Sequence, residues 1–213
     1  FGRRIDYVRL SVTDRCNLRC QYCMAEDMTF LPRRDLLTLE ELAELSRHLM
    51  LRGVKRIRLT GGEPLVRRGI MGLVKQFGAM IGEGLDEVTL TTNGVLLGQY
   101  AGGLAEAGVR RVNVSLDTLD AERFAEVTRG GNIAQVIGGI DAALGAGLQV
   151  KINAVAMRGV NEGQFADLAR WCGARGCDLS LIETMPLGEV EGERLGSYLP
   201  LCAVREELER ELT

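Results

Sequence analysis

Residues 7–23 read YVRLSVTDRCNLRCQYC, a short strand pattern that runs directly into three closely spaced cysteines. The alternation of apolar and polar residues over positions 7–13 predicts a strand with two chemically different faces. Cys16, Cys20 and Cys23 follow at the carboxyl end of that strand, which is the edge where parallel α/β barrels place their chemistry. This stretch therefore predicts both the first strand of a barrel and the position of its site.

The rest of the chain repeats the order of strand followed by helix. Five further strands are expected at residues 56–62, 87–93, 111–117, 149–155 and 178–184. Amphipathic stretches that begin with a cap residue and end at glycine lie between them, as at 38–53, 132–147 and 161–176. Six such units predict a parallel sheet with helices as right-handed crossovers. A full (β/α)8 barrel takes about 250 residues, so the 213-residue chain predicts an α/β fold, an incomplete (β/α)6 TIM-like barrel with outer helices.

Each of the first five expected strands has one apolar face and one polar face. Parallel strands are usually buried on both sides and apolar throughout, so the polar faces are expected to surround a hydrated cavity. An antiparallel sheet with one side in water would give the same alternation, but the order of strands and helices disfavours it.

The polar face carries cations as well as neutral groups. Its members include Arg9, Arg58, Thr91, Ser115 and Lys151. Cations in such a cavity are costly without an anionic partner, and guanidinium and ammonium groups both suit phosphate. We therefore expect a polar, negatively charged ligand, with salt bridges from the arginines to Asp117 as the structural alternative.

The cysteine triplet is one thiol short of a closed metal site. A structural zinc site needs four ligands, and the other candidates lie far along the chain, at His48, Cys172, Cys177 and Cys202. Three thiolates on a [4Fe–4S] cluster leave one iron free to bind a small molecule. We expect this catalytic cluster on the triplet, a redox or zinc-binding module without catalysis being the alternative. The three distant cysteines are interpreted as buried small hydrophobic residues.

The overall composition narrows the class of partner. The net charge of −3 and the absence of a basic stripe exclude nucleic acid and anionic membrane as expected partners. No apolar run reaches the roughly 18 residues of a membrane-spanning helix, so a cytoplasmic protein is expected. We expect a core over residues 1–200, with 201–213 beginning a helix that leads to a further C-terminal region, because the chain starts at Phe1 and ends in a charged helical stretch.

Several motifs together resemble a known family. The Cx3CxxC spacing after the first strand resembles the radical S-adenosylmethionine superfamily, and TGGEP at 60–64 resembles its second motif. The finer match is to its GTP 3′,8-cyclase family of molybdenum cofactor biosynthesis. It is carried by RLTGGEPLVRR (58–68), LTTNG (90–94), VNVSLDTLD (112–120), VKINAV (150–155) and IETMPLG (182–188).

This resemblance implies roles for particular residues. S-adenosylmethionine is expected at Tyr22, Gly61, Gly62, Glu63, Ser115 and Met185, beside the cluster on Cys16, Cys20 and Cys23. GTP is expected at Arg9, Arg58, Thr91 and Lys151, four residues already assigned to the polar face. The implied reaction is reductive cleavage of S-adenosylmethionine followed by radical cyclisation of GTP, the first step towards molybdopterin.

The resemblance also implies partners and marks one departure. A one-electron reductant, a homodimer and a second [4Fe–4S] cluster beyond Thr213 are expected, the latter holding the guanine. Ser180 and Leu181 stand where the family has arginine and phenylalanine, which weakens the triphosphate inference at that strand. A radical enzyme acting on a peptide or porphyrin is the alternative within the superfamily, and the cations of the polar face favour the nucleotide.

Overall fold

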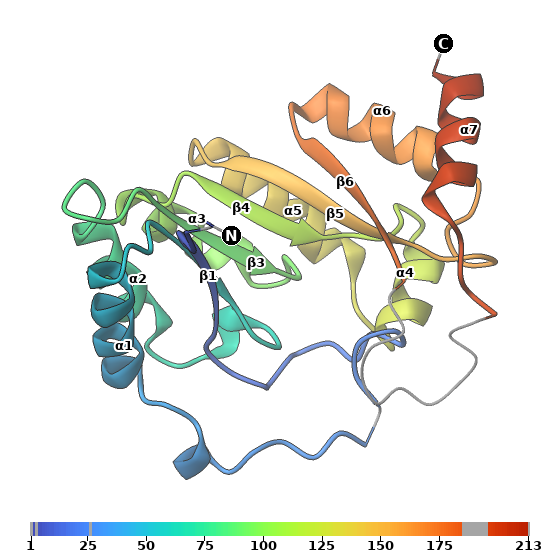
Figure 1. Cartoon of the computed structure of the whole chain (residues 1–213). Coiled ribbons are helices and arrows are strands. Elements are labelled where there is room, and N and C mark those ends of the chain that lie inside the picture. Colours follow the sequence, from blue (N-terminus) through green and yellow to red (C-terminus); the bar gives the residue numbers. More distant parts are fainter. Residues whose placement is uncertain (1, 3, 26, 185–195, 213) are drawn as a thin grey trace.

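The structure is a computed structural model that describes residues 2, 4–25, 27–184 and 196–212. Its sheet has six strands in sequence order, and each strand runs parallel to the one before it (Figure 1). The strands are β1 (Tyr7–Ser11), β2 (Arg56–Thr60), β3 (Glu87–Thr92), β4 (Arg111–Ser115), β5 (Gln149–Ala156) and β6 (Asp178–Glu183). This order confirms the predicted parallel α/β architecture of six strand–helix units.

Seven α-helices and two short 3-10 helices connect the strands in the part of the chain that the structure describes. The α-helices are α1 (Leu39–Leu51), α2 (Ile70–Ala79), α3 (Leu97–Glu106), α4 (Ala121–Thr128), α5 (Ile133–Gly145), α6 (Phe165–Arg175) and α7 (Leu201–Glu211). The 3-10 helices are η1 (Arg33–Asp35) and η2 (Pro64–Val66). Figure 1 shows α3 and α5 behind β3 to β5, with α1 and α2 beside β1.

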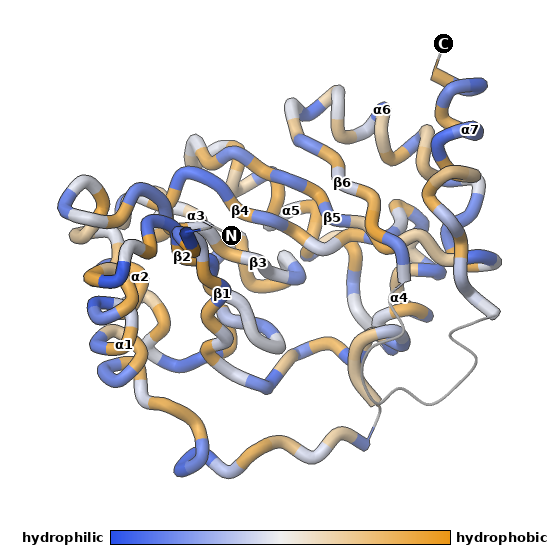
Figure 2. Tube along the Cα trace, in the orientation of Figure 1, coloured by the Kyte–Doolittle hydropathy of each residue, from blue (hydrophilic) through white to orange (hydrophobic). Residues whose placement is uncertain are grey.

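The expected helix caps form at α1 and α5. Thr38 and Glu41 make a reciprocal capping box, with the Glu41 N–H donating to the Thr38 hydroxyl at 3.1 Å. Asn132 accepts from the Ala134 N–H at 2.9 Å and so begins α5. In Figure 2 hydrophilic and hydrophobic residues alternate along α1, as an amphipathic helix on a sheet requires.

The apolar strand faces form the core. Leu59, Leu90, Val112 and Ile152 are each at most 1% exposed and belong to one cluster that spans the sheet and its helices. A second, smaller cluster joins Ala156, Phe165, Leu199 and Val204, so α7 packs against α6 and the end of β5. None of the helices in the described ranges is long and apolar enough to cross a membrane.

The predicted element boundaries need one substantial correction. The stretch 161–176 was expected to begin its helix at Asn161, but α6 begins at Phe165. The Asn161 side chain is fully buried and bonds backbone groups of three residues instead, accepting from the Met157 N–H and donating to the Val155 and Asp117 carbonyls. A side chain engaged in this way organises the turn after β5 rather than capping a helix.

The distant cysteines were interpreted as buried, and two of the three are. Cys172 and Cys177 are 1% and 8% exposed, in the main core. Cys202 is exposed on α7, so the interpretation was wrong there. The reason is that α7 buries only Val204 among its residues and leaves its other faces largely open.

Candidate functional site

The cysteine triplet lies in the segment between β1 and α1, which Figure 1 shows passing close to α4. A backbone hydrogen bond fixes this contact, since the Arg19 N–H donates to the Thr128 carbonyl at 3.2 Å. In the described part of the chain these three cysteines form no disulfide, with Cys16 and Cys20 half-buried and Cys23 exposed. The segment is therefore anchored at the carboxyl ends of the strands and offers sulfur ligands there.

The environment of the thiols disfavours their ionisation without a cation. Burial raises the pKa of Cys20 to about 12, and the negative charge of Asp117 and of the thiolates at Cys23 and Cys16 adds to the shift. Burial also raises the pKa of Cys16. The three cysteines lie within eight residues of one segment, and a bound metal is what would hold them all as thiolates.

The spacing of these thiols bears on the type of metal. Among the described residues, no three His, Cys, Asp or Glu side chains converge in the geometry of a single metal ion. Three thiolates on a cubane bind three different irons, so they need a wider spacing than the ligands of one zinc ion. Three cysteines outside disulfides on one short segment fit such a cluster.

Asn93, directly after β3, contacts the first of these cysteines. Its side-chain amide donates to Cys16 Sγ at 3.6 Å and to Asn17 Oδ1 at 2.8 Å. The Leu18 N–H also donates to Cys16 Sγ, at 3.4 Å. Hydrogen bonds to a ligand sulfur orient it and tune the bound metal, so Asn93 is a positioning residue that the sequence analysis did not identify.

Glu63, predicted to contact S-adenosylmethionine, is fully buried, and its carboxylate already has three donors. The Leu65 N–H, the Thr92 hydroxyl and the Asn93 N–H donate to it at 3.0, 2.8 and 2.7 Å. Burial raises its pKa, while these bonds act in the opposite direction. In this structure Glu63 joins the ends of β2 and β3, and its contact with the cofactor stays a prediction.

The two glycines before Glu63 let β2 approach the cysteine segment closely. A Cβ on Gly61 would lie 2.3 Å from the Thr13 carbonyl oxygen, and one on Gly62 would lie 2.4 Å from that of Arg15. The Gly62 N–H donates to the Thr13 carbonyl at 2.7 Å and the Glu63 N–H to the Arg15 carbonyl at 2.8 Å. Any side chain here would push the segment away, which gives both glycines a structural role beside their predicted cofactor contact.

Tyr22, predicted to lie beside adenine, donates from its hydroxyl to Asp117 Oδ2 at 2.7 Å. The other oxygen, Asp117 Oδ1, accepts from the Val155 N–H on β5 at 2.8 Å. Burial raises the pKa of Asp117 to about 6, although both bonds favour its charged form. These partners replace the salt bridges to Arg9 and Arg58 that were the structural alternative for this carboxylate.

The polar strand faces bring the predicted substrate residues into adjacent rows. Arg9 on β1 is in register with Arg58 on β2, while Thr91 on β3 and Lys151 on β5 flank Asn113 of β4. Ser115 lies one row further along, in register with Asn153. Thus the sheet gathers on one face the residues that the sequence analysis assigned to the substrate.

Three of these side chains keep unused hydrogen-bonding capacity. Thr91 Oγ1 is buried without a partner in the described part of the chain. Neither Arg9 nor Lys151 forms a side-chain hydrogen bond or ion pair with a described residue. Arg58 differs, because its Nε donates to the Thr89 hydroxyl at 3.4 Å and its guanidinium lies 5.4 Å from the Tyr7 ring centroid. Buried polar groups normally find partners, so the Thr91 hydroxyl is available to a ligand, while Arg9 is exposed and Lys151 half-buried and both can turn towards an anion.

The sequence analysis missed a fourth cation on this face. Arg111 begins β4 in register with Thr89 and forms an ion pair with Glu87 at 3.1 Å. Arg111 is two positions before Asn113 on the same strand, so the alternation of faces could have placed it on the polar face. Because Arg111 already has an acidic partner, it adds less free positive charge than Lys151.

One predicted site residue cannot be placed. Met185 lies outside the described residues. Ser180 and Leu181, the departures from the family pattern, are half-buried on β6, where Ser180 is in register with Asn153. The sheet therefore offers a hydroxyl and an amide at the position where a cation was expected.

Comparison with known proteins shows the family of this chain. Residues 10–172 match the radical SAM superfamily. The chain is 57% identical over its full length to a GTP 3′,8-cyclase of Rhizobium etli, and 56% identical to one of Erythrobacter litoralis. It spans 61% and 64% of the lengths of these two relatives.

Solved structures agree with the fold. Streptococcus suis SuiB bound to S-adenosylmethionine matches with a TM-score of 0.80 at 20% identity, over 97% of this chain and 47% of SuiB. Methylornithine synthase matches with a TM-score of 0.71 at 20% identity, over 99% of this chain and 64% of that protein. The Cx3CxxC segment after β1 and the open six-stranded sheet thus have an established context: the chain belongs to the radical SAM superfamily.

Proposed function

We infer that this chain is the core of a radical S-adenosylmethionine enzyme that acts on GTP, in the manner of the GTP 3′,8-cyclases it resembles. The observation that carries the proposal is the combination of two features on one sheet. The cysteine segment lies at the strand ends, and the adjacent polar face carries cations and a buried hydroxyl without partners. Relatives 57% identical over the whole chain support the same activity.

The residues that would hold the cofactors are those of the strand ends. Cys16, Cys20 and Cys23 would hold a [4Fe–4S] cluster, with Tyr22, Gly61, Gly62, Glu63, Ser115 and Met185 proposed around S-adenosylmethionine. The cluster, when bound, supplies the electron for reductive cleavage of S-adenosylmethionine. Asn93 and Glu63 hold the ligand segment against β3, which keeps the thiols in place relative to the substrate face.

The substrate would lie along the polar face. Arg9, Arg58 and Lys151 are proposed to bind the phosphates of GTP, since guanidinium and ammonium groups form charge-assisted bonds to phosphate oxygens. The Thr91 hydroxyl is proposed to gain its missing partner from the same ligand. The protein then acts mainly by holding the ribose near the cofactor and by excluding water.

We propose that these 213 residues carry out the first steps of the reaction and that the complete reaction needs a longer protein. Cofactor binding and cleavage of S-adenosylmethionine are proposed for these 213 residues. Complete cyclisation is proposed for a protein of the length of the Rhizobium etli relative, of which this chain spans 61%. A one-electron reductant and a second [4Fe–4S] cluster belong to that longer enzyme.

Isothermal titration with GTP under anaerobic conditions tests the substrate assignment. Lys151→Ala is expected to weaken binding about 10- to 100-fold, the equivalent of one charge-assisted bond. Lys75→Ala is the matched control, because Lys75 is exposed on α2. This variant should bind GTP with the same affinity as the parent protein. Equal affinity in all three proteins would contradict the assignment of the polar face to GTP.

Anaerobic reconstitution separates the radical enzyme from a zinc or redox module. We expect about four irons per chain from the triplet, and release of methionine when the reduced protein meets S-adenosylmethionine. Stoichiometric zinc without visible absorbance would support the non-catalytic module. A protein that cleaves S-adenosylmethionine but does not bind GTP would favour a peptide or porphyrin substrate.

A further inference from the structure

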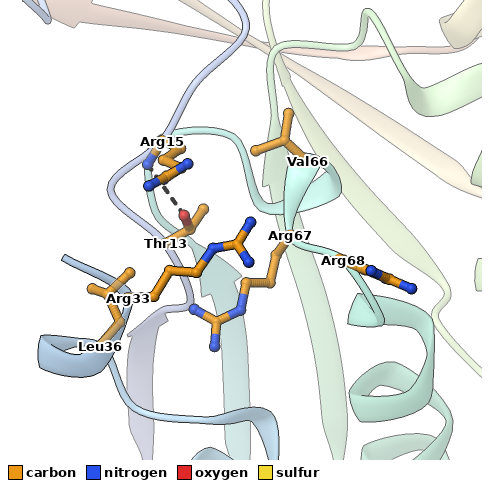
Figure 3. A pocket seen from close by; sticks show the side chains of 7 residues that line it. All are labelled: Thr13, Arg15, Arg33, Leu36, Val66, Arg67 and Arg68. Atoms are coloured by element: carbon orange, nitrogen blue, oxygen red, sulfur yellow. Dashed lines mark hydrogen bonds between the residues drawn. The ribbon is translucent and has the colours of Figure 1, made fainter. Parts of the chain in front are cut away.

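A cationic cavity lies outside the polar face of the sheet, beside the cysteine segment. It has a volume of about 310 Å³ and is lined by Arg15, Arg33, Arg67 and Arg68 together with Thr13 and apolar side chains (Figure 3). Arg15 precedes the first cysteine, Arg33 begins η1, and the other two follow η2. None of these four arginines was assigned to the cofactors or to GTP.

The charge of this cavity is not balanced by acidic residues. No lining residue is acidic. The nearby Asp35 is paired with Arg34 at 3.7 Å. Asp14 accepts from the Leu31 N–H at 2.6 Å through Oδ2, and its buried Oδ1 has no hydrogen-bond partner among the described residues, so it is not bonded to the arginines. Four arginines thus line one cavity in a chain whose net charge is −3, which creates a local positive potential. In Figure 3 the Arg68 guanidinium points away from those of the other three.

Part of the cavity is rigidly built. Arg67 donates from one terminal nitrogen to the Val12 carbonyl at 3.0 Å and from the other to the Leu37 carbonyl at 2.7 Å. A guanidinium has five N–H donors, so Arg67 retains donors after these two bonds are made. The Arg15 backbone carbonyl is held by the Glu63 N–H at 2.8 Å, which fixes the start of that side chain.

The other two arginines are unengaged. The side chains of Arg33 and Arg68 make no hydrogen bond or ion pair with another described residue. Figure 3 shows the guanidinium groups of Arg33 and Arg67 close to one another. Such a group of like charges is stabilised when an anion binds between its members.

We propose that this cavity binds a diphosphate-type anion, either free or as the phosphate chain of a nucleotide. A volume of 310 Å³ is at the small end of ligand pockets, which run from about 300 to 1,000 Å³, and is large for a single phosphate. Guanidinium forks match phosphate oxygens in pairs, and four of them balance the three to four charges of a diphosphate. The bound anion would join η1 and η2 to the segment that carries the cysteines.

Isothermal titration of the cluster-loaded protein with inorganic pyrophosphate tests the proposal. The Lys151→Ala background weakens phosphate binding at the polar face, and comparing variants within that one background isolates the contribution of the cavity. In that background, Arg33→Gln combined with Arg68→Gln is expected to weaken pyrophosphate binding at least 10-fold. Arg34→Gln is the matched control and should leave the affinity unchanged, because Arg34 is an exposed neighbour paired with Asp35.

The outcomes separate the ligand classes. Tighter binding of pyrophosphate than of orthophosphate supports the diphosphate class, and comparison with GTP then shows whether a free or a nucleotide-borne phosphate chain is preferred. Absence of pyrophosphate binding, equal affinity for orthophosphate, or the same loss in Arg34→Gln would overturn the proposal. Circular dichroism melting curves of the variants check folding, which should be unchanged because the Arg33 and Arg68 side chains have no described partners.

Discussion

Tyr22→Phe tests how the cysteine segment is held to the sheet. The substitution removes the hydroxyl that donates to Asp117 Oδ2 at 2.7 Å and keeps the ring. Asp117 is 6% exposed and would retain one of its two side-chain bonds, that from the Val155 N–H. We expect a loss of folding stability that depends on pH, because the lost hydrogen bond contributes more free energy when the carboxyl group is charged than when it is neutral.

The size of the effect follows from the state of Asp117. Above its pKa of about 6 the carboxylate is charged, and a hydrogen bond to a charged group contributes about 1.5–3 kcal/mol. Below that pKa the group is neutral, and the bond contributes about 0.5–1.5 kcal/mol. The free energy of unfolding should therefore fall by roughly 1–2 kcal/mol more at pH 8 than at pH 5.

The sign of the parent protein's own pH dependence provides a second check. The folded pKa of Asp117 is raised from 3.8 to about 6, so the folded state binds more protons than the unfolded state between these values. Through this group the free energy of unfolding falls by about 3 kcal/mol as pH rises from about 4 to about 6, and is constant above. Without the Tyr22 bond, which lowers the pKa, the fall should extend about one unit higher.

Urea denaturation of the metal-free, reduced protein, followed by circular dichroism at pH 5 and pH 8, measures these differences. Tyr100→Phe is the control, since the Tyr100 hydroxyl on α3 makes no hydrogen bond to a described residue. An equal loss at both pH values, or no loss, would refute the argument that Tyr22 stabilises a charged Asp117.

Two further substitutions address the same segment. Gly62→Ala places a Cβ 2.4 Å from the Arg15 carbonyl oxygen and should cost about 1–3 kcal/mol, with loss of iron on reconstitution. The control Gly72→Ala, in open space on α2, should keep the iron content and should not lower the melting temperature, because alanine favours a helix over glycine. Asn93→Ala removes the donor to Cys16 Sγ and should lower the cluster's reduction potential and weaken iron retention about 10-fold. An unchanged potential would contradict this; Asn132→Ala, which removes the cap of α5 but no bond to a cysteine, is the control.

The sequence predicted the sheet well because its signal is local. Alternation with a period of two fixes which strand residues face the helices, so the positions of six strands and the faces of the first five followed from neighbouring residues alone. The strand ends were less accurate, as in the first strand, which was expected at 7–13 and ends at Ser11. The residues after Ser11 alternate equally well but are held by Gly62 and other groups of a distant loop.

The connections at the site depend on contacts between distant positions. Asn93 is 77 residues from Cys16, and Asp117 is 95 from Tyr22. Spacing could mark the cysteines and the polar face, but it could not show which polar groups bind each other across the sheet. The helix start predicted at Asn161 was wrong partly for the same reason, because the Asn161 side chain donates to the carbonyl of Asp117, 44 residues away.

These long-range bonds hold the cysteine segment in a fixed position relative to the strands that carry the proposed substrate residues. Asn93 contacts Cys16 through its side chain and Glu63 through its backbone, while Asp117 joins Tyr22 to β5. Lys151 and Thr91 lie on those same strands, β5 and β3. A radical reaction needs its two reacting carbons within contact distance, and misplacement by about 1 Å can cost 10²-fold in rate. For the proposed reaction, the polar residues that hold the cysteine segment to β3 and β5 would therefore help to set the distance between cofactor and substrate.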